Sequence, residues 1–67
     1  MKNSYFHERL NDKQVVEQYI EKINTYEIEM ARILLGNIYM LANDHPKFST
    51  LLHTYQQRLK REQDKKE

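Results

Sequence analysis

Apolar residues in the first two thirds of the chain recur at intervals of three and four, the period of a helix that buries one face. The members of this stripe are Val16, Ile20, Ile23, Met30, Leu34, Ile38 and Leu41. Asn11 precedes the stripe as a capping side chain, with Gln14 three residues later in a capping-box arrangement. The pattern predicts a long helix over 12–42, and leaves open a break at Asn24 and Thr25, which are weak helix formers.

A second apolar stripe follows a polar stretch that ends in the only proline of the chain. Pro46 disfavours the α conformation in the residue before it, so the first helix ends there, and Asp44 or His45 can cap the next one. The apolar residues that follow at helical spacing are Phe48, Leu52, Tyr55 and Leu59, with Leu51 beside them. These features predict a second helix over 46–62.

The two ends of the chain carry weaker signals. Residues 1–10 contain Tyr5 and Phe6 and predict either a short helix capped by Ser4 or an irregular arm. Residues 63–67 contain no apolar side chain and predict an exposed charged tail, either a fraying helix end or disordered.

Together these elements indicate an all-α fold in a single small domain over 1–67, because one glycine and one proline leave few places for turns. An antiparallel hairpin of the two helices leaves part of the longer one uncovered. A chain of 67 residues without cysteine has no disulfide to stabilise it, so we expect it to dimerise into a four-helix bundle. The residues expected at the dimer interface are Val16, Tyr19, Ile20, Ile23, Glu27 and Met30.

The residues that catalysis requires are missing or isolated. The chain has no nucleophile elbow, no glycine-rich phosphate loop and no zinc-binding histidine pair. Its histidines, His7, His45 and His53, fall in three separate segments, without the spacing of metal ligands. We therefore expect a protein that is not an enzyme and has no catalytic residue, metal or cofactor.

Charge and hydropathy bear on the location of the protein. The 11 basic and 10 acidic side chains give a net charge of +1, too weak to attract nucleic acid or an acidic membrane by itself. No run approaches the about 18 apolar residues that a membrane span needs, and the start lacks the apolar segment of a signal peptide. We expect a cytoplasmic protein. Residues favoured by AT-rich codons are abundant, which indicates a bacterium of low GC content, or its phages or plasmids.

Several aromatic and basic residues fall outside the predicted core and are candidates for binding a protein partner. Tyrosine is favoured at interfaces because it combines a large area with a polar tip, and the end of the chain has a small excess of basic residues. The candidates are Tyr5, Phe6, Tyr39, Arg58 and Arg61. We expect an adaptor or inhibitor of a regulatory protein, such as a bacterial repressor, kinase or replication protein.

Two other functions remain open. The basic residues near the C-terminus of two copies could straddle a nucleic-acid duplex, which predicts binding that weakens steeply with salt. Direct contact with nucleic acid is disfavoured, because Glu62 and Asp64 are interleaved with the basic residues. A purely structural oligomerisation module is the other alternative, and it predicts no ligand besides a second copy of the chain.

Overall fold

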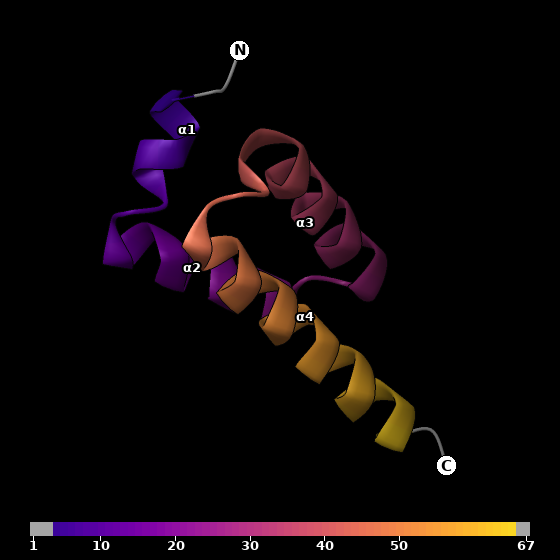
Figure 1. Ribbon diagram of the computed structural model, residues 1–67. Coiled ribbons are helices and arrows are strands. Elements are labelled where there is room, and N and C mark those ends of the chain that lie inside the picture. Colours follow the sequence, from indigo (N-terminus) through magenta and orange to yellow (C-terminus); the bar gives the residue numbers. More distant parts are fainter. Residues whose placement is uncertain (1–3, 66–67) are drawn as a thin grey trace.

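The computed structural model describes residues 4–65, and this part of the chain consists of four α-helices (Figure 1). Helix α1 spans Ser4–Arg9, α2 spans Lys13–Thr25, α3 spans Ile28–Ala42 and α4 spans Pro46–Lys65. No strand occurs between residues 4 and 65, so the expected all-α fold class is confirmed. Residues 1–3 of the expected N-terminal segment and 66–67 of the expected tail lie outside the described residues.

The region expected to form one long helix is broken at Tyr26 and Glu27. Both residues have extended backbone, with φ −70° and ψ 161° at Tyr26 and φ −57° and ψ 150° at Glu27. The Tyr26 amide donates to the carbonyl oxygen of Lys22 at 2.9 Å and closes the last turn of α2. The prediction of one continuous helix over 12–42 is therefore wrong, and α2 and α3 take its place. The break that the sequence left open at Asn24 and Thr25 occurs directly after these residues.

The break changes the direction of the chain, so that α3 returns along the molecule and α4 then runs in the same direction as α2. Two contacts fix this direction. His45, just before α4, contacts Asn11, just before α2, and Arg58 in the second half of α4 reaches Ile23 near the end of α2. Helix α4 packs on both α2 and α3, and α1 packs on α3 (Figure 1). Three helices thus pack together where a two-helix hairpin was expected.

The buried core residues come from α2, α3, α4 and the turn after α1. These residues are Leu10, Val16, Ile23, Leu35, Ile38, Ala42 and Leu51. Val16 and Ile23 of α2 are thus buried inside one chain, and Tyr19 and Ile20 pack against the same cluster. The expectation that Val16 and Ile23 need a second copy to cover them is wrong, because both are buried in the core of one chain, where α4 packs against α2. Tyr19 and Ile20 are partly buried.

The N-cap of α2 lies one residue later than expected. Asp12, not Asn11, is the N-cap of α2, and its Oδ1 accepts a hydrogen bond from the Gln14 amide at 3.0 Å. The side chain of Asn11 instead contacts the ring of His45, with 2.9 Å between Oδ1 and Nε2. The cap expected at Asn11 is wrong because a tertiary contact uses its side chain.

Helix α4 is longer than expected and buries a different face. It continues to Lys65, so part of the expected tail is helical. Leu51 is completely buried, whereas Leu52 and Leu59 are each 36% exposed. Phe48 and Tyr55 of the predicted stripe pack against the core, as expected. Because α4 packs against two helices, its buried face centres on Leu51, and the prediction that Leu52 and Leu59 lie in the seam is wrong.

Substituting the two neighbouring leucines of α4 tests this assignment. We expect Leu51→Ala to lower the free energy of unfolding by about 2–5 kcal/mol, the usual cost of a large cavity in a core. Leu52→Ala serves as the matched control and should cost less than half as much, since its side chain is partly in solvent already. Urea unfolding followed by circular dichroism measures both. Equal losses would place Leu52 on the buried face and contradict the assignment.

Candidate functional site

Helix α3 is apolar around most of its circumference, but the described chain buries only one side of it. The buried residues of α3 are Ala31, Leu35, Ile38 and Ala42. A helix that is apolar all round is normally enclosed by other protein or by lipid. The opposite side of α3 is therefore the surface of this chain that most needs an explanation.

We call this opposite side the α3 apolar face and define it by Met30, Ile33, Met40 and Leu41. Their exposed fractions are 53%, 58%, 81% and 38%. Asn37 lies among them, and residues spaced three and four apart share one side of a helix. The 15 residues of α3 give this face a length of roughly 22 Å. Contiguous exposed apolar surface on a small soluble protein is typical of an interaction site.

The make-up of this face suits contact with another chain. Two of its four residues are methionines, whose flexible thioether side chains adapt to differently shaped partners. Asn37 places one polar group within the apolar surface, and one such residue in a helix seam fixes the register of pairing. Gly36 is the neighbouring residue, and a Cβ atom added there would meet nothing within 4 Å. Packing within the described chain therefore gives no reason for glycine at this position.

The end of the α3 apolar face nearest α2 is acidic. Glu27 is the N-cap residue of α3 but makes no side-chain capping hydrogen bond, and Glu29 lies in the first helical turn. Both are exposed, and negative charge is favourable at the N-terminal end of a helix. Of the six residues expected at a dimer interface, Glu27 and Met30 are the two that the fold leaves exposed.

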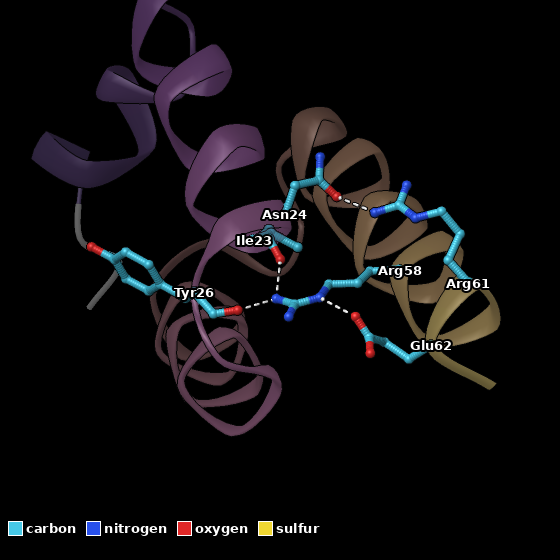
Figure 2. Close-up of polar contacts among 6 residues, drawn as sticks. All are labelled: Ile23, Asn24, Tyr26, Arg58, Arg61 and Glu62. Atoms are coloured by element: carbon cyan, nitrogen blue, oxygen red, sulfur yellow. Dashed lines mark hydrogen bonds and ion pairs between the residues drawn. The ribbon is translucent and has the colours of Figure 1, made fainter. Parts of the chain in front are cut away.

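Arg58 is the residue that holds the break between α2 and α3. Its Nη1 donates hydrogen bonds to the carbonyl oxygen of Ile23 at 3.0 Å and to that of Tyr26, and its Nε donates to Glu62 at 3.5 Å (Figure 2). The last carbonyl groups of a helix lack hydrogen-bond partners within the helix, and Arg58 is the donor for two such groups here. Its side chain is only 11% exposed. The described contacts of Arg58 thus lie within the chain, and its expected contact with a partner stays a prediction.

Arg61, one turn further along α4, makes a second and more exposed contact with α2. Its Nη2 donates to Oδ1 of Asn24 at 3.0 Å (Figure 2). An open hollow beside these groups is lined by Asn24, Arg58, Arg61, Glu62 and Asp64. Because the lining carries both positive and negative groups, the hollow favours neither an anion nor a cation.

The predicted aromatic candidates differ in their surroundings. Phe6 packs against the core cluster, with its ring centroid 6.1 Å from that of Tyr19. Tyr5 is 71% exposed, and its hydroxyl accepts a hydrogen bond from Nη1 of Arg9 at 3.3 Å. Tyr39 is 53% exposed and belongs to α3. Phe6 is thus a core contact, whereas Tyr5 and Tyr39 offer surface to a partner.

The five predicted partner residues do not come together into one site. Tyr5 and Phe6 belong to α1, whereas Arg58 and Arg61 belong to the C-terminal half of α4, at the other end of the molecule (Figure 1). Only Tyr39 lies on the helix that carries the α3 apolar face. A surface that needs all five residues at once is therefore ruled out by the fold.

Sequence reasoning missed the α3 apolar face itself. The predicted apolar stripe includes Met30 and Leu41 of this face, and no role was predicted for Met40. The available signal was the density of apolar residues between 30 and 42, which is too high for a single helix face. This density predicts apolar residues on two sides of the helix, of which only one can face the core of so small a domain.

Other classes of site and relationship give no further guidance. Within residues 4–65, no three His, Asp or Glu side chains are arranged to hold a metal ion. None of the four described helices combines the length and apolarity needed to cross a membrane. Comparison with known protein families, with curated proteins and with solved structures found no match. The candidate site is therefore assigned from its geometry alone.

The role of Arg58 can be tested against Arg61 as a matched control on the same helix. We expect Arg58→Met to lower the free energy of unfolding by about 1–3 kcal/mol, because it removes the donor from two carbonyl groups. Arg61→Met removes one exposed contact and should change stability by less than about 0.5 kcal/mol. Urea unfolding measures both, and equal effects would contradict the role assigned to Arg58.

Proposed function

We propose that this protein is a small helical adaptor or inhibitor, not an enzyme, which binds a protein partner through the α3 apolar face. The observation that carries the proposal is that α3 exposes large apolar side chains on one side while its other side lies in the core. Covering apolar surface contributes about 25 cal/mol per Å². A partner that covers this face therefore gains most of its binding free energy there.

The occupant that fits this face is an amphipathic helix of the partner. Met30, Ile33, Asn37 and Met40 are spaced by three, four and three residues, which is the spacing of a seam between two helices. Residues 4–65 contain no strand edge to which a partner strand could add. Glu27 and Glu29 near one end of the face favour a partner helix with basic residues at the matching end.

The rest of the fold supports such binding by holding α3 in place before the partner arrives. Core residues fix one side of α3, and Arg58 fixes the break that precedes it. A surface that is already ordered loses less entropy on binding. Covering a helix of a regulatory protein would block its contacts with other molecules, so inhibition by occlusion is the mechanism we propose. We also propose that the protein acts in the cytoplasm of a bacterium or of a phage-infected cell.

A second copy of the chain is the alternative occupant of the same face, and Asn37 is the observation that favours it. The asparagine amide both donates and accepts hydrogen bonds, so it can pair with its own copy across a two-fold axis. Such a dimer would use α3, in place of the α2 residues expected from the sequence. A protein that only dimerises in this way would be a structural oligomerisation module.

Replacing two central residues of the face tests the proposed docking. We expect Ile33→Gln combined with Met40→Gln to weaken binding at least about tenfold, since each removes apolar area from the contact. Both side chains are more than half exposed, so the free energy of unfolding should stay within about 0.5 kcal/mol of the wild-type value. The probe is a display library of amphipathic helical peptides selected on the wild-type protein, with the affinity of enriched peptides measured by fluorescence anisotropy.

Tyr5→Ala is the matched control for this experiment, because Tyr5 is exposed on a different helix. It should leave the affinity of the selected peptides unchanged. Peptides that bind the double variant as well as the wild type, or that lose affinity with Tyr5→Ala, would overturn the assignment to α3. Sedimentation of the same proteins identifies the occupant: a wild-type dimer that the double variant abolishes would mean that a second copy, not a partner helix, covers the face.

Gly36 provides an independent test. Alanine is favoured over glycine in a helix interior, so Gly36→Ala should raise the free energy of unfolding by about 0.5–1 kcal/mol, given the open space around this position. If a partner helix approaches closely beside Asn37, the added methyl group should weaken peptide binding at the same time. Greater stability with unchanged affinity would show that the partner does not approach the backbone there.

A further inference from the structure

His45, the last of the three residues between α3 and α4, contacts three other segments of the chain. Its side chain is the one buried polar group recorded among the described residues, at 5% exposed. Its ring centroid lies 4.7 Å from that of His7 on α1, with the two rings edge to face. Nε2 lies 2.9 Å from Oδ1 of Asn11, and Nδ1 lies 3.0 Å from the amide nitrogen of Lys47 on α4. One imidazole thus joins α1, the turn before α2 and the start of α4.

These contacts determine which nitrogen of His45 carries the proton. A backbone amide can only donate, so Nδ1 must accept from Lys47 and carries no proton. In the neutral ring the proton then sits on Nε2, which donates to Oδ1 of Asn11. Both ring nitrogens are satisfied in this single form. The fold is therefore built around neutral His45.

A second proton would have to enter at Nδ1, where it would face the Lys47 amide. Two donors would then point at one another, and the N-terminal cap of α4 would be lost. The new positive charge would also lie at the N-terminal end of a 20-residue helix, where the helix dipole opposes it. Protonation of this ring is thus incompatible with the contacts that begin α4.

All the neighbouring charged groups except Asp44 lower the pKa of His45. Burial is the largest influence and lowers the pKa of His45, followed by His7 on α1; Lys47 on α4 also lowers it, while Asp44 raises it. Asp44 is shared with His7, since its Oδ1 lies 3.0 Å from Nε2 of that ring. As the pH falls, the unfolded chain, whose histidine pKa is about 6.5, therefore takes up the proton at a higher pH than the folded chain does. Stability is complete above this value and falls as the pH drops below it.

We propose that His45 is a proton-sensitive latch: protonation of its ring releases the first turn of α4 from α1 and from the turn before α2. The released turn includes Phe48, whose ring centroid lies 5.7 Å from that of Tyr39 on α3. Opening the latch therefore exposes a further aromatic side chain and loosens the side of α3 that Tyr39 occupies. The latch rests on the contacts of His45 alone and does not depend on what binds the α3 apolar face.

The latch is tested by the pH dependence of unfolding between pH 5 and 8. For the wild type, we expect the unfolding equilibrium constant in urea to rise as the pH falls below about 6.5, by up to about tenfold per pH unit, the limit for one proton. His45→Asn keeps a good capping residue but cannot take up a proton, so its curve should be nearly flat. His53→Asn is the matched control, because His53 is exposed on α4, and should retain the wild-type slope.

A direct titration keeps the proposal testable if His45→Asn does not fold. In NMR spectra of the wild-type protein, the ring of His45 should titrate at a lower pH than histidine in an unstructured peptide, whose pKa is about 6.5. Over the same pH range, the amides of the first turn of α4 should lose protection from hydrogen exchange before those of α2. The latch is excluded if His45 titrates at or above the pKa of histidine in an unstructured peptide, if His45→Asn keeps the wild-type slope, or if all helices lose protection together.

Discussion

The contact between Arg58 and the end of α2 is the interaction on which the rest of the structure depends. The chain leaves the helical conformation at Tyr26 and Glu27, and the carbonyl groups freed at Ile23 and Tyr26 accept hydrogen bonds from one guanidinium group. Without this break α2 and α3 would form one rod, and α4 could cover only part of it. With the break, a 67-residue chain encloses a core of its own.

The same break explains why α3 has apolar side chains that no other part of the described chain covers. Once α4 lies against both α2 and α3, the apolar residues of α2 are covered, while α3 has apolar residues on more sides than its neighbours can reach. Met30, Ile33 and Met40 stay in solvent for this reason. The core and the exposed face at which docking is proposed are therefore two consequences of one packing arrangement.

His45 and Arg58 each connect α4 to the region of α2. The imidazole of His45 connects the start of α4 to the turn before α2, and the guanidinium group of Arg58 connects the second half of α4 to the end of α2. Histidine is the side chain whose ordinary charge change lies closest to neutral pH. The proton sensitivity that we propose therefore belongs to the contact at the start of α4.

The sequence by itself determined the features that depend on neighbouring residues. Helical periodicity established the all-α class, and Pro46 marked the start of the last helix, because backbone preference and capping act over a few residues. Only the tertiary structure decided the break at Tyr26, the use of Arg58 as an internal donor and the burial of Val16 by α4. Each of these rests on contacts between segments distant in the sequence, and the apolar pattern alone cannot tell which neighbour covers which face.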